Sequence, residues 1–386
     1  ETEPLYGETY LPRKYKVGVT IQGDNQIDIY SYDTGLIGVL ENGKLVGWNV
    51  VAGGGLGMSH GRPNTFAQIA ENIGFVAIED GVAATRVIAT IYRDFGNRFD
   101  RKQARLKYLI DKMGVDQFRQ EFIDRCEFEV HPFRETPEIQ IEDWMGKHEQ
   151  GDGKFFYGVF VENGRIKDTD DVKLRTAFLK IVKTLDCPTT LTPQQSILFN
   201  DLDESQINQL ESILTEHHVP LLHDLSNARR YSMACPSMPT CGLAVAESER
   251  VMPDFITEVE NAFTKLGIAD TQLTIRMTGC PNGCARPYTA DIALVGRRPG
   301  IYHLFVGGRL AGDRMADLYA ADVKIEAILE TLKPLLTKFA ADRNPGEGLG
   351  DFYQRVLERT ESRKRVTGKE VPTFDDVQPK LIQIGA

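Results

Sequence analysis

The chain has 386 residues, 41% of them hydrophobic and 26% charged, which is enough for two or three domains with separate cores. Its 55 acidic and 45 basic residues give a net charge of −10, which argues against a surface built for nucleic acid. Apolar stretches such as 45–52 are far shorter than the about 20 residues that span a bilayer, and no secretory leader is visible. These features predict a cytoplasmic protein without membrane partners. A plastid protein is expected instead if the sequence comes from a plant or an alga.

The first part of the chain is predicted to contain strands followed by helices. The strands are rich in β-branched residues and end at glycine-rich turns; they cover 16–22, 26–32, 35–41 and 44–52. The helices have apolar residues at helical spacing; they cover 65–72, 83–94 and 100–121. A polar segment with prolines over 131–153 then predicts a linker.

A small α/β unit is predicted after the linker. It has the order strand, helix, strand, helix, over 154–166, 171–185, 195–199 and 204–217. The last part of the chain is predicted to contain a helix that ends at Leu266, followed by strands and then by helices within 322–341. These strands cover 272–278, 291–295 and 301–306.

Two parts of the chain resemble each other and predict a diverged internal duplication. Leu36-Ile37-Gly38 matches Leu294-Val295-Gly296, and Val51-Ala52-Gly53-Gly54 matches Phe305-Val306-Gly307-Gly308. This alignment places Lys14 and Lys16 near Arg276 and Thr278, so that the first copy has a basic pair where the second has its last two cysteines. The identities are few, and a chance similarity of two meanders remains the alternative.

Four of the six cysteines form two pairs in loops with glycine and proline. Cys235 and Cys241 are separated by five residues, and Cys280 and Cys284 by three. Four thiolates can ligate an iron–sulfur cube. The alternatives are ordinary buried thiols, or a zinc site, for which the first spacing is wider than usual. The remaining two, Cys126 and Cys187, are expected to be ordinary buried thiols.

Two basic segments stand out in this acidic chain. Lys14 and Lys16 alternate, so a strand places both on one face, where they form either an anion site or a solvated edge. A second segment is dense in cations that suit a carboxylate-rich cofactor, although each could also lie on a solvated helix face. Its members are Arg98, Arg101, Lys102, Arg105 and Lys107. The glycines over 53–57 could let the backbone approach a macrocycle, with a plain turn as the alternative.

The segments Met233–Cys241 and Thr278–Tyr288 resemble the cluster motifs of sulfite reductase haemoproteins, members of the sirohaem-dependent sulfite and nitrite reductases. The resemblance implies an α+β fold. It consists of internally duplicated sirohaem and iron–sulfur domains of mixed α/β structure, with a small ferredoxin-like β-α-β-α half-domain between them. The implied division is a first reductase domain, incomplete at its N-terminus, a linker, the half-domain and a second reductase domain with the cysteines. They cover 1–130, 131–153, 154–223 and 224–386.

The resemblance also implies roles for individual residues. Cys235, Cys241, Cys280 and Cys284 would hold a 4Fe-4S cluster, and Cys284 would also bridge to the sirohaem iron. Lys14 and Lys16 would bind sulfite and help supply protons. The remaining implied residues would contact sirohaem; they are Arg13, Arg101, Arg105, Lys107 and Asn282.

The implied function is the six-electron reduction of sulfite to hydrogen sulfide in sulfate assimilation. The Ala-Arg-Pro-Tyr continuation after Cys284 is more similar to the ferredoxin-dependent branch than to the NADPH-linked one, so ferredoxin is the expected electron donor. Nitrite reduction to ammonia with the same cofactors is the alternative. The resemblance covers only the C-terminal two-thirds of a typical member, and the chain lacks an initial methionine. We therefore expect a fragment; a truncated, non-catalytic iron–sulfur electron-transfer protein is the other alternative.

Overall fold

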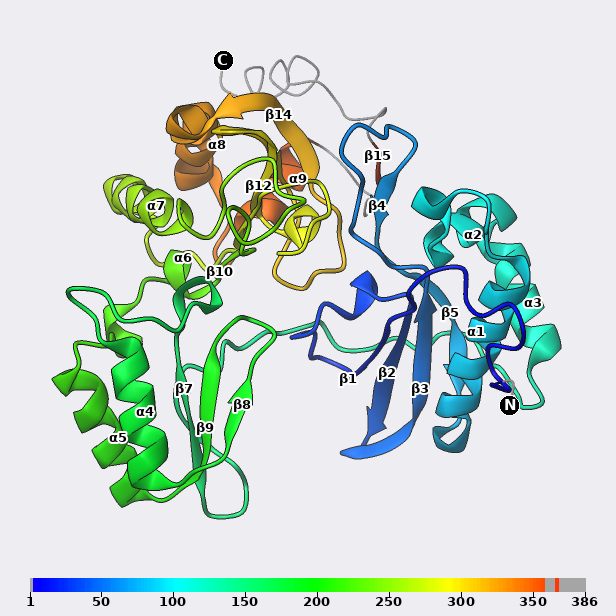
Figure 1. Ribbon diagram of the computed structural model, residues 1–386, viewed down its shortest axis with the longest axis horizontal. Helices are drawn as coiled ribbons and strands as arrows, with labels where there is room; N and C mark the ends of the chain where they lie inside the picture. The colour runs from blue at the N-terminus through cyan, green and yellow to red at the C-terminus, as the bar shows by residue number, and fades with distance from the viewer. Residues whose placement is uncertain (1–2, 358–364, 368–386) are drawn as a thin grey trace.

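The computed structural model describes residues 3–357 and 365–367 and contains three larger sheets, each covered by helices (Figure 1). The first sheet consists of β1 (Val17–Ile21), β2 (Thr34–Glu41), β3 (Lys44–Ala52) and β5 (Glu71–Val76). One side of it is covered by α1 (Gly81–Phe95), α2 (Leu106–Met113) and α3 (Val115–Arg125). Val50, Ile88 and Phe118 are fully buried between these layers. Within the described residues, no helix is long and apolar enough to span a membrane.

The second sheet is antiparallel throughout and lies in the middle of the chain. Its order is β6 (Gly146–Glu149), β7 (Phe155–Val159), β9 (Ile197–Leu202) and β8 (Thr189–Leu191). Two helices, α4 (Leu174–Leu185) and α5 (Glu204–Glu216), cover one face (Figure 1). Asp203 and Gln206 form a capping box that explains where α5 begins. This unit is therefore a helix-covered antiparallel sheet, in which the sequence analysis missed β6 and β8.

The third sheet carries the cysteine loops. Its order is β10 (Ser232–Ala234), β11 (Ile275–Thr278), β12 (Ile292–Arg298), β13 (Ile301–Val306) and β14 (Asp317–Lys324). It packs against α7 (Met252–Leu266), α8 (Ile328–Asp342) and α9 (Leu349–Val356), through buried residues such as Ile256, Leu336 and Phe352. The short α6 (Asn227–Arg230) precedes β10, and a separate ribbon pairs β4 (Phe66–Gln68) with β15 (Arg365–Thr367).

The internal duplication is confirmed by strand order and register. In the first copy, β1 pairs with β2 in parallel, and the pairs β2–β3 and β3–β5 are antiparallel. In the second copy, β11 pairs with β12 in parallel, and the pairs β12–β13 and β13–β14 are antiparallel. The copies share a carboxylate at the same place. Asp33 accepts the backbone N–H of Lys16 at 2.9 Å, and Asp291 accepts that of Thr274 at 2.9 Å.

This register corrects the predicted alignment of the two copies. Val19 pairs with Leu36 as Met277 pairs with Leu294, so Lys16 is equivalent to Thr274 and not to Thr278. The first-copy equivalent of the second cysteine pair is 22–26, which contains no cysteine. The basic pair and the cysteine pair therefore occupy different positions in the repeat, because the prediction shifted β1 by four residues.

Three predicted elements are wrong. The expected strand over 26–32 is a loop with a short 3-10 helix, because Asp28 adopts a left-handed conformation with φ 53°. The expected helix over 65–72 instead contains β4 and the start of β5, whose pairing overrides the apparent helical spacing. The expected helices within 322–341 begin only after β14, and α9 was not predicted.

Close backbone packing at equivalent glycines gives a stability prediction. A Cβ at Gly54 would lie 2.2 Å from the carbonyl oxygen of Tyr30, and one at Gly308 would lie 2.3 Å from that of Thr289. Gly54→Ala and Gly308→Ala should each lower the free energy of unfolding by about 2 kcal/mol, because backbone must move. Urea denaturation measures this, with Gly242→Ala as the control, since that Cβ would have no neighbour within 4 Å. Equal free energies of unfolding for all three variants would contradict the close backbone contacts at Gly54 and Gly308.

Candidate functional site

A cleft of about 780 Å³ lies where the first block, which is the first sheet with the segment before it and α1 to α3, meets the second cysteine loop, residues 280–284. The segment before β1, the glycine loop after β3 and the loop from Cys280 to Cys284 all contribute to its lining. Its basic lining residues are Arg13, Lys14, Lys16, Arg62, Arg101, Lys102, Arg105, Lys107 and Arg286. The cleft is therefore strongly cationic, although the chain as a whole is acidic.

The four paired cysteines are brought together by two neighbouring parallel strands. Cys235 directly follows β10, and Cys280 comes two residues after β11, so both loops leave the same edge of the sheet. The backbone N–H of Gly279 donates to Cys235 Sγ at 3.3 Å, which ties the loops together. Burial and the neighbouring cysteines, including Cys241, raise the pKa values of Cys280 and Cys284.

The four paired cysteines are all available as ligands. All four cysteines are free thiols, and Cys280 and Cys284 also line the cleft. Within the described residues, no three His, Cys, Asp or Glu side chains are placed to hold a single metal ion. Four thiolates can ligate either an iron–sulfur cube or a zinc ion, so the zinc alternative stays open at this point.

The two other cysteines lie in hydrophobic cores. Cys126 packs against the core of the first block, where burial raises its pKa to about 12. Cys187 belongs to the core of the second sheet, and burial raises its pKa as well. Both positions agree with the prediction of ordinary buried thiols.

Lys14 and Lys16 both face the cleft because Tyr15 between them faces the core. The Tyr15 hydroxyl lies 2.5 Å from Thr34 Oγ1, and its ring stacks on Tyr92. Burial at the cleft wall lowers the pKa of Lys16, and the nearby charges of Arg105 and Lys14 lower it further. This arrangement supports an anion site rather than a solvated basic edge.

Arg105 is held in place by a buried carboxylate. Its Nε and Nη2 atoms donate to the two oxygens of Asp33 at 2.9 and 2.7 Å. Asp33 is fully buried, and its burial keeps its pKa above the ordinary value although Arg105 lowers it. Because Asp33 also accepts the N–H of Lys16, one carboxylate positions two of the predicted site residues. Asp33 was not predicted from the sequence, although its equivalence to Asp291 in the repeat was an available signal.

The Lys107 ammonium group binds backbone carbonyl groups, whereas it was expected to contact the cofactor. It is 1% exposed, and its ammonium group donates to the carbonyl oxygens of Gly55 at 2.7 Å, Gly57 at 2.8 Å and Phe66. All three ammonium protons thus have backbone partners. Lys107 lines the cleft but holds the glycine loop, rather than offering a free charge to a ligand.

The glycine loop touches the second cysteine loop directly. The N–H of Met58 donates to the carbonyl of Pro281 at 2.9 Å, and a Cβ at Gly57 would lie 3.1 Å from the carbonyl oxygen of Asn282. Residues 55–57 line the cleft, as does Asn282. The glycines therefore allow a close contact with the cysteine loop, while the approach of this backbone to a macrocycle stays a prediction.

Some of the other predicted basic residues line the cleft, and one does not. Arg13 and Arg101 line the cleft, and their contact with sirohaem stays a prediction. Arg98 does not, because its guanidinium donates to Thr9 and to backbone carbonyls of Tyr10 and Arg93. Arg62 and Arg286 line the cleft but were not predicted, since Arg62 is an isolated cation in a loop.

Removing the Lys107 ammonium should destabilise the protein. Lys107→Met leaves three carbonyl groups without their charged partner, and we expect the free energy of unfolding to fall by about 3 kcal/mol. Lys102→Met is the matched control, because Lys102 is exposed at the same cleft. Its effect should stay within about 0.5 kcal/mol. Similar urea midpoints and slopes for both variants would show that the buried ammonium is not required.

Comparisons with known proteins agree with this geometry. The model of the "Nitrite and sulphite reductase 4Fe-4S domain" matches residues 1–130, and that of the "Nitrite/Sulfite reductase ferredoxin-like half domain" matches residues 148–217. The sulfite reductase (NADPH) hemoprotein beta-component of Staphylococcus saprophyticus is 43% identical over 356 residues, covering 92% of this chain and 62% of the relative. The sulfite reductase (ferredoxin) of Synechococcus elongatus is 41% identical over 363 residues, covering 92% and 57%.

A solved structure supports the fold. The NirA protein of Mycobacterium tuberculosis superposes with a TM-score of 0.70 at 23% identity, covering 90% of this chain and 64% of that one. The chain spans about three-fifths of the length of the curated relatives that it matches.

Proposed function

Because this chain belongs to the family of nitrite and sulfite reductases, we propose that it is the part of a sulfite reductase that binds a 4Fe-4S cluster and sirohaem and reduces sulfite to hydrogen sulfide. The observation that carries the proposal is the placement of Lys14, Lys16 and Cys284 in one cationic cleft. Neither lysine is near Cys284 in sequence, so their meeting in one cleft supports an anion site next to a thiolate of the proposed cluster.

The residues present fit the proposed cofactors. Sirohaem carries several carboxylates, and the cleft offers guanidinium groups that suit them. Arg13, Arg101 and Arg105 would hold the carboxylates, with Asn282 beside them, and the four paired cysteines would hold the cluster. Arg105 keeps its orientation because both oxygens of Asp33 bind it. When bound, the haem and the cluster would pass the six electrons of the external donor to the substrate one at a time.

The chain itself would bind the anion and move protons. Lys14 and Lys16 would attract sulfite and orient it through charge-assisted hydrogen bonds. The lowered pKa of Lys16 makes its ammonium a better proton donor than an ordinary lysine. Since the reduction of sulfite consumes protons at every stage, such a donor beside the substrate would shorten their path. Asp33 positions Lys16 through the backbone N–H and so acts indirectly.

The electron donor is proposed to be a separate protein. Relatives named for NADPH and for ferredoxin have similar identities to this chain, 43% and 41%. Our proposal of ferredoxin rests on the Ala-Arg-Pro-Tyr segment after Cys284. A cytoplasmic location is proposed with it.

Turnover of the holoenzyme tests the proposal. The full-length protein, supplied with a reduced donor, should oxidise it in the presence of sulfite and release sulfide in a ratio of six electrons to one. Ferredoxin and an NADPH-reduced flavoprotein are compared as donors, and nitrite is compared as substrate. No sulfite-dependent oxidation with either donor would overturn the proposed function. Faster turnover of nitrite than of sulfite would favour the alternative substrate.

A further inference from the structure

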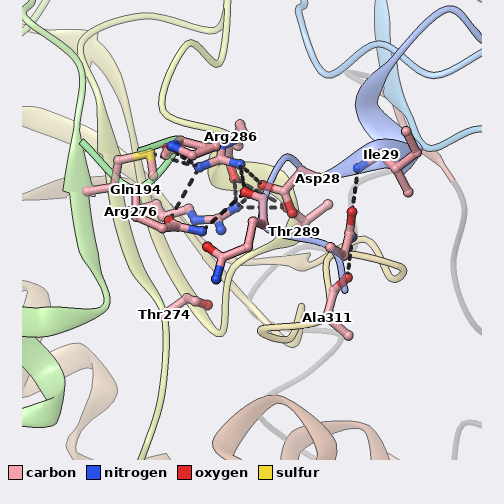
Figure 2. A network of polar contacts seen from close by, with 12 residues as sticks. Asp28, Ile29, Gln194, Thr274, Arg276, Arg286, Thr289 and Ala311 are labelled. Carbon is pink, nitrogen blue, oxygen red and sulfur yellow. Dashed lines mark hydrogen bonds and ion pairs between the residues drawn. The ribbon is translucent and has the colours of Figure 1, made fainter. Parts of the chain in front are cut away.

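A buried ion network lies beside the second cysteine loop, and one of its members, Arg286, also lines the cleft. Asp28, which precedes the short helix 29–31, faces two arginines of the other copy (Figure 2). Its Oδ2 atom lies 2.6 Å from Arg286 Nη1 and 3.0 Å from Arg276 Nη1. The side chains of Asp28 and Arg276 are each 2% exposed. The internal repeat makes Asp28 and Arg286 equivalent positions, so this pair joins the two copies at matching points.

The network joins three parts of the molecule. Arg276 lies on β11 and donates to the carbonyl of Arg286 at 3.0 Å. Arg286 follows Cys284 by two residues, and its Nη2 atom donates to the carbonyl of Pro193 at 2.9 Å, next to the antiparallel sheet. Figure 2 shows these groups converging on Asp28. The end of the second cysteine loop is thereby fixed to the first copy and to the middle unit.

Arg286 also reaches the first cysteine loop. Its Nη2 atom lies 3.5 Å from the sulfur of Met233, which precedes Cys235 by two residues. Met233 is paired in register with Arg276 across β10 and β11. The two guanidinium groups are therefore adjacent to the strands and loops from which both cysteine pairs project.

The charges of the network do not balance among themselves. Two guanidinium groups form ion pairs with one carboxylate, so the three side chains together carry one positive charge. Among the described residues, Asp28 Oδ1 and Arg276 Nε are buried without a hydrogen-bond partner. Burial and the neighbouring Arg286 lower the pKa of Arg276, while Asp28 raises it. The buried Asp291 also acts on Arg276 and raises its pKa, but the ion pairs of both arginines are with Asp28. An uncompensated buried cation is costly, so a nearby negative charge would relieve it.

We propose that Asp28, Arg276 and Arg286 form a positioning triad that fixes the second cysteine loop and whose excess positive charge raises the reduction potential of the cluster. This inference rests on the proposed function, because it needs a cluster at the four cysteines. A cube held by four thiolates is an anion that becomes more negative on reduction. A nearby cation therefore stabilises the reduced form more than the oxidised form.

Variants that change the charge of the triad in opposite directions distinguish an electrostatic effect on the cluster potential from a purely structural role of the triad. Asp28→Asn raises the triad charge from +1 to +2 and should move the cluster potential to a more positive value. Arg286→Gln lowers the charge to 0 and should move the potential to a more negative value. Arg286→Lys keeps the charge and should stay close to the wild type. Arg125→Gln is the control, since Arg125 pairs with Asp94 and Glu121 on the helical side of the first block.

The experiment uses the full chain, reconstituted anaerobically with ferrous iron and sulfide. Iron and labile sulfide are counted, and the potential is read from a redox titration followed by electron paramagnetic resonance. Shifts in opposite directions for Asp28→Asn and Arg286→Gln support the triad. Shifts in the same direction, or none, would overturn it. If Asp28→Asn does not fold, the cluster potentials of Arg286→Gln and Arg286→Lys are compared. A more negative potential for Arg286→Gln alone supports the triad, and equal potentials overturn it. A wild-type chain that binds no cluster would instead contradict the proposed function.

Discussion

Cys284→Ser should abolish sulfite reduction by the full-length protein and remove the coupling between haem and cluster. Cys284 is exposed to the cleft, whereas Cys280 of the same pair is buried, so Cys284 is the thiol that can face both cofactors. Serine keeps the size of the side chain but is a poor ligand for iron at neutral pH, because its hydroxyl does not ionise as a thiol does. We expect turnover below detection, with altered haem absorption bands and less labile sulfide.

Cys126→Ser provides the matched control. Cys126 is a half-buried free thiol that packs against the core of the first block and does not line the cleft. The variant should keep the absorption spectrum and the turnover of the wild type, even if it unfolds at a lower urea concentration. Equal activity of Cys284→Ser and Cys126→Ser would show that Cys284 has no role in the site.

The second large effect is expected at the paired lysines. Lys14→Met and Lys16→Met should each lower kcat/KM for sulfite by about 10²-fold to 10³-fold, as the loss of a charged donor in a preorganised site does. Steady-state turnover with sulfite measures this. Lys102→Met is a suitable control, because Lys102 lines the same cleft but projects from the exposed segment before α2. An effect of Lys102→Met as large as that of Lys16→Met would mean that only the overall positive charge matters.

The pH dependence of turnover should identify Lys16. Its pKa is lowered by burial and by Arg105 and Lys14, so it loses its proton at a lower pH than an ordinary lysine does. The proposed function takes the protonated ammonium as the active form, so kcat/KM should fall as the pH rises through this lowered pKa. Lys16→Arg should keep the charge and move the fall to higher pH. A profile unchanged by Lys16→Arg would assign the fall to another group.

Much of the fold could be predicted because strong local patterns agree with the tertiary structure. The strand over 44–52 and the strand over 301–306 have the bounds that the structure shows, since both end at turns with glycine or proline. The segment 65–72 could not be predicted in the same way. Its apolar residues bury themselves by pairing with distant strands, and local spacing does not contain that information.

The site was predictable where motifs are dense and was not where it depends on tertiary partners. The cysteine spacing indicated a cluster, and the alternation of Lys14 and Lys16 indicated a shared face. Nothing local showed that Lys107 would turn to three carbonyl groups, because these belong to segments that fold against it. Asp28 and Arg276 are likewise 248 residues apart and meet only through the repeat.

The central claim is that one cleft joins a cationic cofactor site to a four-cysteine cluster site. An anaerobic absorption spectrum of the purified protein, with iron and acid-labile sulfide measured on the same sample, tests it most directly. The account predicts sirohaem bands together with iron and sulfide in the proportions of one haem and one 4Fe-4S cluster. Zinc at the cysteines, or a protein without iron and sulfide after anaerobic reconstitution, would contradict it.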